Sequence, residues 1–350
     1  MKKRIIALAA ILALLVTTIV SGCGTGQNGT TGQTQNNNGG KPVKTIEIAI
    51  ASCCVTEDVT TKEIIPAFEK YYKDKFGEEV DIRPTFAGSG TLTNQIIGNT
   101  PIQLAVLSNE AYALKLKEKG FAQSDWKDLP NKGVVAKSAM VILVREGNPK
   151  GIKSFEDLTK PGIKVIHANP ATSGGAAWSI YSVYGSALKK TEAGGKKDEQ
   201  AAFDLLKKVE TNVISMPESS KQAGAQFAAG QGDALITYEQ EALLELDKGK
   251  KYDVVVPDST ILTDWTVVKI DKNISEDNKQ VVDEFANFLF TDEAQKAYAE
   301  YGFRSYKDEI TEQLSDKYAK ITLPFDLSYL GGPIEAKKNI IEDIWRKTQQ

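Results

Sequence analysis

Histidine is almost absent from this chain, which has a single one, His167, among its 350 residues. Histidine is the side chain that proteins use most often for acid–base catalysis and for binding metals near neutral pH. His167 lies at the end of an expected strand, where a packed or solvated side chain is a better interpretation than a catalytic base. The composition therefore argues against enzymes that depend on histidine.

The chain also lacks the short motifs that mark several enzyme classes. It contains no Gly-x-Ser-x-Gly elbow, no Gly-x-x-x-x-Gly-Lys-Ser/Thr phosphate loop and no Cys-x-x-Cys pair. Clusters of metal-binding residue types are missing from the sequence too, and Glu239 and Glu241 are interpreted as helix-start residues rather than as an acid–base pair. We expect no catalytic residue, no metal site and no cofactor.

Long apolar runs are missing from the chain except at its N-terminus. Ile5 to Val20 follows the charged Lys2-Lys3-Arg4 and is short for a membrane span. The run ends in Ser21-Gly22-Cys23, which looks like a bacterial lipobox. We expect residues 1–22 to be a lipoprotein signal peptide and Cys23 to be lipidated, which would anchor an extracytoplasmic protein to the cell membrane. A plain secretory signal with an incidental cysteine is the alternative.

The segment after the lipobox lacks both charged and apolar side chains. Residues 24–40 are almost wholly Gly, Gln, Asn and Thr. Such a segment cannot bury enough surface to fold, so we expect residues 23–43 to be a flexible tether. Roughly 300 residues follow it, enough for one large or two ordinary domains.

An excess of positive charge is missing as well. The chain has 43 Lys and Arg against 46 Asp and Glu, and removal of the signal peptide lowers the basic count to 40, for a net charge of −6. Proteins that bind nucleic acid usually carry a basic stripe, so we expect no nucleic-acid partner. An anionic ligand is still compatible with this balance, because backbone N–H groups bind dianions without full countercharges.

The sequence contains four copies of one pattern, in which a strand is followed by a Ser- or Gly-rich loop and a helix. Thr172 and Ser173 can cap one such helix, and Gly174 and Gly175 leave its first N–H groups uncovered. The strands and their loops are 46–51 with 52–56, 80–86 with 87–90, 163–166 with 172–175, and 213–216 with 217–220. Open α/β sheets bind ligands just beyond the carboxyl ends of their strands. Four such loops could surround one small oxyanion with donors.

Several separate motifs resemble the sulfate/thiosulfate-binding proteins of bacterial ABC importers, in the right order from about Lys44 to about Tyr306. The motifs are Leu143–Lys150, Asn169–Gly175, Gly232–Ile236, Glu239–Leu244 and Ser259–Leu262. The resemblance implies a solute-binding lipoprotein that captures sulfate or thiosulfate and delivers it to a membrane permease without catalysing a reaction. We expect it to be a monomer.

The alternation of strand and helix patterns predicts an α/β protein with mostly parallel sheets and helices on both faces. The resemblance adds the two-lobe type II periplasmic-binding-protein fold, with the ligand in the cleft between the lobes. We place lobe one at 44–137 and 259–350, and lobe two at 138–258. Hinge motion would close the lobes on the ligand.

The resemblance also implies which residues bind the ligand. The expected donors are the backbone N–H groups of Cys54, Ser89, Gly174, Gly175 and Ser220, the hydroxyl of Ser173, and Tyr238 in place of a tryptophan of the family. A second departure is Glu57, where the family has an arginine. Glu57 either faces solvent, which we favour, or accepts a hydrogen bond from a protonated phosphate.

The ligand and the redox state of the first loop stay open at this point. Sulfate only accepts hydrogen bonds, whereas phosphate keeps a proton for much of its population; phosphate, molybdate and tungstate are alternative ligands. An enzyme or a sensor on the same two-lobe body is the alternative from another class. Adjacent cysteines close only a strained ring, so two reduced thiols at Cys53 and Cys54 are favoured over a vicinal disulfide.

Overall fold

The computed structural model describes residues 45–171, 176–314 and 316–350. These residues belong to one compact unit, Val43–Gln350. Its strands are β1 (Thr45–Cys53), β2 (Glu79–Ala87), β3 (Leu104–Leu107), β4 (Val134–Arg145), β5 (Val165–Ile166), β6 (Val213–Ser215), β7 (Ala234–Tyr238), β8 (Tyr252–Val255), β9 (Ser259–Lys269) and β10 (Leu323–Phe325).

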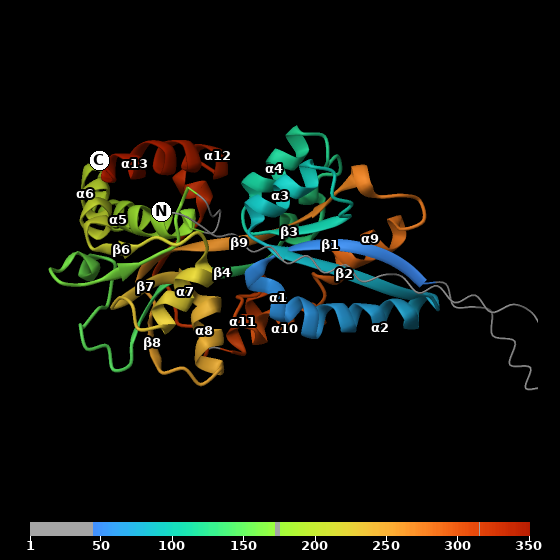
Figure 1. Cartoon of the computed structure of the whole chain (residues 1–350), viewed down its shortest axis with the longest axis horizontal. Helices are drawn as coiled ribbons and strands as arrows, with labels where there is room; N and C mark the ends of the chain where they lie inside the picture. The colour runs from blue at the N-terminus through green and yellow to red at the C-terminus, as the bar shows by residue number, and fades with distance from the viewer. Residues whose placement is uncertain (1–44, 172–175, 315) are drawn as a thin grey trace, which may run out of the picture. The chain divides into compact units, whose positions relative to one another are not determined.

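The helices alternate with these strands along the chain (Figure 1). They are α1 (Glu57–Val59), α2 (Ile65–Phe76), α3 (Ser89–Ile97), α4 (Glu110–Glu118), α5 (Ala177–Ala193), α6 (Glu199–Thr211), α7 (Ser220–Ala228), α8 (Glu239–Asp247), α9 (Lys279–Phe288), α10 (Asp292–Glu300), α11 (Asp308–Glu312), α12 (Pro333–Ala336) and α13 (Arg346–Thr348). A π-helical segment, Thr60–Ile64, joins α1 to α2, and another, Lys337–Trp345, joins α12 to α13.

The strands follow the order β2-β1-β3-β9-β4-β7-β5-β6, with β10 paired to β9 and β8 paired to β4. Strand β1 pairs in parallel with β2 and β3, and β5 pairs in parallel with β6 and β7. The two long strands β4 and β9 run antiparallel to each other, and β4 is also antiparallel to β7 and β8. The expected parallel pairing therefore describes the outer strands, whereas the centre of the sheet is antiparallel.

Strand β4 connects two groups of strands, as Figure 1 shows. Its first half, Val134–Ala139, pairs with β9, and its second half, Met140–Val144, pairs with β7. Strand β9 pairs in turn with β3, from Thr266 to Lys269. The partner of β4 changes between Ala139 and Met140, whereas the sequence placed a chain crossing near 137–138. The lobe boundaries at 44–137, 138–258 and 259–350 stay a prediction.

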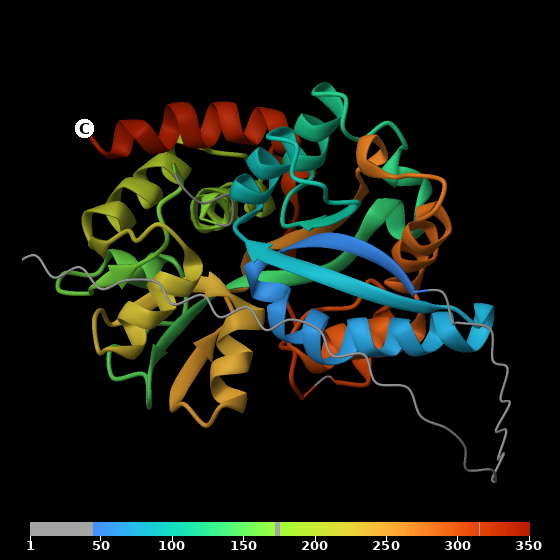
Figure 2. The same ribbon diagram turned by 45° about the vertical axis from the view of Figure 1, so that its right-hand side comes forward.

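Alternation along the strands decides which helix covers which face of the sheet. In β1, Ile48 and Ile50 join a core cluster with Phe68 of α2, whereas Ala51 joins a separate cluster with Leu92 of α3. Successive side chains of a strand point to opposite faces, so each face needs its own helices. Figures 1 and 2 show α2 on one side of β1 and β2, and α3 on the other.

The second group of strands follows the same rule. Ile142 of β4 and Ile236 of β7 pack in one cluster with Trp178 of α5, whereas Leu143 and Leu235 pack in another with α7 and α8. The four neighbouring positions are all buried. This explains the unbroken apolar runs Ala139–Val144 of β4 and Ala234–Ile236 of β7, because a strand segment covered on both faces is apolar throughout.

The last segment, from Pro333 to Thr348, contacts α5 and α6, and its first helix α12 also contacts α4. Its anchor is Glu210 of α6, whose Oε2 accepts hydrogen bonds from Trp345 Nε1 at 2.9 Å and Gln349 Nε2 at 2.8 Å. Glu210 Oε1 lies 3.0 Å from Nε2 of the fully buried His167. This network ties the C-terminal helix to the residue that follows β5.

Both ring nitrogens of His167 face oxygen acceptors, since Nδ1 lies 2.8 Å from the Ala168 carbonyl oxygen. Only a doubly protonated imidazole can donate from both nitrogens, so His167 and Glu210 form a buried ion pair. Burial opposes the charge of His167, but the hydrogen bond and charge of Glu210 raise the pKa of the imidazole. Burial likewise opposes the charge of Glu210, but His167⁺ and the Trp345 and Gln349 donors lower the pKa of the carboxyl.

We expect Glu210→Gln to lower the free energy of unfolding by about 3–5 kcal/mol at pH 6, because the variant leaves His167 buried without its anionic partner. The raised pKa of His167 stabilises the wild type below the pKa of the unfolded histidine, and this gain is lost as pH rises through the folded value. The difference between wild type and variant should therefore shrink at pH 9. Urea denaturation at both pH values measures it.

Asp74→Asn is the matched control, because it removes an exposed carboxylate paired with Lys70 at 2.6 Å. An exposed pair of this kind contributes less than about 1 kcal/mol. Equal stability of Glu210→Gln and the wild type at pH 6 would contradict the buried ion pair.

Candidate functional site

The first predicted loop begins where β1 ends. Cys54 starts a short 3₁₀ turn, Cys54–Thr56, directly after the strand. The Thr56 hydroxyl donates to the Cys53 carbonyl oxygen at 2.8 Å and lies 2.5 Å from the Ser52 hydroxyl, which closes the turn. The first N–H groups of a helical turn have no acceptor inside it, so the Cys54 N–H has the geometry of a ligand donor.

The second loop places Ser89 as the first residue of α3, with only 1% of its surface exposed. Its hydroxyl oxygen accepts a hydrogen bond from the Ser108 N–H at 2.9 Å and lies 3.0 Å from the Ser108 hydroxyl. Ser108 directly follows β3, the strand next to β1 in the sheet. The carboxyl ends of β1, β2 and β3 therefore bring the first two loops together.

The remaining predicted donors within the described residues are Ser220, at the start of a helix, and Tyr238, just before one. Ser220 is the first residue of α7, and the hydroxyl of Ser219 caps that helix by accepting from the Gln222 N–H at 3.2 Å. Tyr238 is the residue before α8; it is 2% exposed, and its ring lies 5.5 Å from that of Trp265. Burial raises the pKa of Tyr238 well above its usual value, so its phenol keeps the proton that a donor needs.

The Cys53 sulfur lies at the meeting point of the first two loops. The Cys54 thiol donates to this sulfur, and together with the Ser89 and Ser108 hydroxyls it lowers the pKa of Cys53 to about 6 against the opposing effect of burial. The same hydrogen bond, together with burial, raises the pKa of Cys54. Both cysteines are free thiols in the structure.

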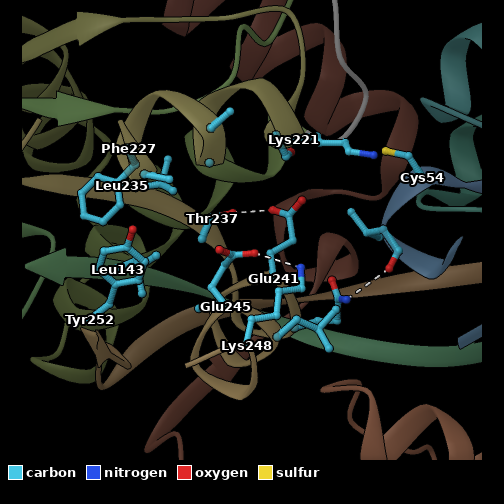
Figure 3. A pocket seen from close by; sticks show the side chains of 18 of the residues that line it. Cys54, Leu143, Lys221, Phe227, Leu235, Thr237, Glu241, Glu245, Lys248 and Tyr252 are labelled. Atoms are coloured by element: carbon cyan, nitrogen blue, oxygen red, sulfur yellow. Dashed lines mark hydrogen bonds and ion pairs between the residues drawn. The ribbon is translucent and has the colours of Figure 1, made fainter. Parts of the chain in front are cut away.

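A cavity of about 420 Å³ opens beside these loops (Figure 3). Cys54 lies on one side of it, opposite Ser220 and Lys221 of α7 and the first two turns of α8. Its apolar part is formed by Leu143, Phe227, Leu235 and Tyr252. Ser89 and Tyr238 are buried just outside the lining, and Tyr238 is close enough to Cys53 and Cys54 for their charges to raise its pKa.

Glu241 is the most perturbed acid in this cavity. It lies mostly buried, and its Oε2 accepts a hydrogen bond from the Thr237 hydroxyl at 2.5 Å. Burial raises the pKa of Glu241 to about 7 despite that hydrogen bond. Near neutral pH, a cation placed beside Glu241 would therefore shift its carboxyl from the neutral to the charged form.

Three contacts join the two predicted lobes across the cleft. The Trp178 indole N–H of α5 donates to the Ser108 carbonyl oxygen at 3.1 Å, and the Gln240 amide of α8 donates to the Val55 carbonyl oxygen at 3.1 Å. Nearer the solvent, Lys221 Nζ lies 3.8 Å from Glu57 Oε2. Residues of the two predicted lobes are therefore in contact in this structure. Separation of the predicted lobes would have to break the two hydrogen bonds and the ion pair.

Of the four described residues of the predicted site, Cys54 and Ser220 line the cavity, whereas Ser89 and Tyr238 are buried and do not line it; their role as ligand donors stays a prediction. Ser173, Gly174 and Gly175 lie outside the described residues. Glu57 is exposed, as expected, but it also borders the cavity. The sequence prediction missed Ser108, Glu241 and Lys221. Glu241 could have been suspected from its position in the first turn of the helix after β7, and Ser108 from its position after β3.

The described part of the chain shows neither a group of metal-binding side chains nor a membrane-spanning helix. There, no three acidic, cysteine or histidine side chains come close enough together to hold a metal ion. Within the same ranges, no helix has the length and apolarity needed to cross a bilayer.

The chain is similar to known proteins over most of its length. The model of a family described as bacterial extracellular solute-binding protein matches residues 54–304. A sulfate-binding protein of Synechococcus elongatus is 34% identical over 93% of this chain and 89% of its own length. A thiosulfate-binding protein of Pseudomonas aeruginosa is 31% identical over 74% of this chain and 79% of its own.

A solved structure gives the same result for the fold. The sulfate-binding protein SubI from Mycobacterium tuberculosis H37Rv superimposes with a TM-score of 0.75 at 26% identity, over 84% of this chain and 98% of that one. The fold is thus a mixed α/β periplasmic-binding-protein fold, which defines the class as extracellular solute-binding proteins. The chain belongs to the sulfate/thiosulfate-binding protein family, whose members bind solutes and are not enzymes.

The hydrogen bonds on the Cys53 sulfur lead to a testable prediction. We expect the ultraviolet absorbance of a thiolate to titrate near pH 6 in a Cys23→Ser background. Cys54→Ala should raise that midpoint, because the thiol donor that contributes most to the lowered pKa is lost. Cys54→Ser, which keeps a hydroxyl donor, is the control and should shift it less. A midpoint near the usual thiol pKa in the parent protein would contradict this arrangement of the two cysteines.

Proposed function

We propose that this protein captures sulfate or thiosulfate in the cleft between its lobes and delivers the anion to the permease of an ABC importer. The observation that carries the proposal is that Cys54 and Ser220, each the first residue of a helical segment, line one cavity, while Ser89, the first residue of α3, lies beside Cys53. Helix N-termini present bare N–H groups and the positive end of the helix dipole. The sulfate- and thiosulfate-binding relatives support the choice of anion.

Backbone N–H groups only donate hydrogen bonds, so they suit a dianion such as sulfate, which carries no proton and only accepts them. They bind it without a strong cation. Each N–H group replaces part of the water that sulfate loses on entering, and one missing donor would cost about 1–3 kcal/mol. The protonated phenol of Tyr238 adds a donor where the family has an indole N–H. Delivery follows from closure, because the cross-cleft bonds of Trp178 and Gln240 hold both predicted lobes in one fixed arrangement that a permease could recognise.

Ser220→Asp tests the site without disturbing the fold. A carboxylate at the first residue of α7 favours the helix by about 0.3–1 kcal/mol, so the variant should remain folded. The same carboxylate would stand beside the bound anion, and two like charges about 4 Å apart repel by roughly 4 kcal/mol near a protein surface. We expect sulfate affinity, measured by titration calorimetry, to fall more than about tenfold.

Ser220→Asn, neutral and of the same size, is the control and should bind nearly as the wild type does. Sulfate binding by Ser220→Asp at wild-type affinity would place the ligand elsewhere. A thermal-shift panel of sulfate, thiosulfate, phosphate, molybdate and tungstate on the wild type identifies the anion. A protein that responds to none of them would contradict the proposed function.

We also propose that a lipid on Cys23 holds the protein at the outer surface of the cell membrane, based on the Ser21-Gly22-Cys23 order. Cys23→Ser should release the protein from the membrane fraction with unchanged sulfate affinity, since the tether separates the anchor from the cleft. Fractionation followed by calorimetry on the released protein measures both. Retention of Cys23→Ser in the membrane fraction would exclude this anchor.

A further inference from the structure

The cavity beside the predicted donors is much larger than sulfate requires. Its volume of about 420 Å³ corresponds to roughly a dozen water molecules at the density of liquid water, whereas sulfate has five heavy atoms. Cys54 and Ser220, two of the predicted anion donors, line this same cavity. A ligand whose anionic end met those donors could therefore extend into the cavity.

The far part of the cavity is suited to a short hydrocarbon chain. Leu143 of β4 and Leu235 of β7 come from adjacent strands, and Phe227 of α7 and Tyr252 of β8 stand next to each other with ring centroids 5.3 Å apart. Figure 3 shows these four side chains grouped at one end of the cavity. Apolar surface of this kind favours methylene groups over an inorganic ion.

The polar part of the cavity favours a cation instead of a second anion. Its lining contains four carboxyl groups, those of Glu57, Asp58, Glu241 and Glu245, and only two ammonium groups, those of Lys221 and Lys248. Ion pairs at the rim already engage Asp58 with Lys62 at 2.8 Å and Glu245 with Lys248 at 3.0 Å. Among the described residues Glu241 has no such ion-pair partner, and its carboxyl accepts a hydrogen bond from the neutral Thr237 hydroxyl.

We propose that the cleft binds short aminoalkanesulfonates, zwitterions whose sulfonate would meet the N–H groups of Cys54 and Ser220 while the ammonium pairs with Glu241. This inference rests on the proposed function, because it uses the same anion donors for the sulfonate end. Thr237 is the next-to-last residue of β7 and Glu241 lies in the first turn of α8, and Figure 3 shows the Glu241 carboxyl in the middle of the lining. The elevated pKa of Glu241 fits this role, since an ammonium would stabilise the charged form that burial disfavours.

Two variants separate the organic ligand from the inorganic one. Gly224 of α7 lines the cavity, and a Cβ added there meets no atom within 4 Å, so Gly224→Leu fills the space without a clash with its neighbours. Glu241→Gln keeps the shape of the side chain and removes its charge. Gly224→Ala, which adds one methyl group, and Glu245→Gln, whose carboxyl is paired with Lys248, are the matched controls.

The experiment is titration calorimetry on the full chain with sulfate, aminoethanesulfonate, aminopropanesulfonate and propanesulfonate. We expect aminopropanesulfonate to bind at least about tenfold tighter than propanesulfonate, the value of one charged hydrogen bond, and Glu241→Gln to remove that difference. The same variant should leave sulfate affinity equal or higher, because a nearby negative charge is lost. Gly224→Leu should abolish aminosulfonate binding and keep sulfate binding.

The outcomes distinguish this inference from the proposed function. Binding of sulfate without any sulfonate would overturn the inference and leave the proposed function intact. Equal affinity for aminopropanesulfonate and propanesulfonate would remove Glu241 from the site. Binding of aminosulfonates without sulfate or thiosulfate would support the cavity and overturn the proposed inorganic ligand. Binding of none of these anions would overturn both.

Discussion

The pairing of β4 with β9 is the constraint on which the rest of this structure depends. Strand β4 changes partner from β9 to β7 between Ala139 and Met140, so one continuous backbone belongs to both groups of strands. The junction is held from outside by Arg304, which exchanges two backbone hydrogen bonds with Lys137 and binds Glu239 through two side-chain bonds of 2.7 and 2.8 Å. Because Glu239 is 1% exposed, this pair fixes the start of α8, and with it Tyr238 and Glu241, relative to the long strands.

The site follows from that constraint. Parallel strands on either side of the long pair end at loops that start α3, α7 and the turn after β1, and these loops bring backbone donors to one place. The cleft is nevertheless asymmetric. One part gathers small hydroxyls and the two thiols, with buried hydrogen bonds among Cys53, Ser89 and Ser108, whereas the other part is a larger space with an apolar end and a buried carboxyl. An anion site and an adjoining acidic cavity can therefore serve two ends of one ligand.

The C-terminal helix is tied to α6 and to the residue that follows β5. It is held on α6 by the buried carboxylate of Glu210, which also binds His167. His167 stands two residues before Asn169, whose N–H donates to the Pro217 carbonyl oxygen at 2.8 Å. Through these bonds the end of the chain supports the backbone at Asn169 and Pro217, which stand just before two of the predicted anion loops. The only histidine of the chain acts as a structural cation.

The sequence by itself determined the local elements and the family of this protein. Strand periodicity located β1, β2 and β6, Ser and Gly located the loops after them, and the ordered motifs indicated the solute-binding family, because these signals depend on neighbouring residues. Tertiary structure alone decided which distant groups meet. The burial of Glu241, the hydroxyls around Cys53 and the His167–Glu210 pair join residues far apart in the chain, and no local pattern encodes such distances. The antiparallel centre of the sheet was missed for the same reason, since the direction of a strand depends on the path of the whole chain.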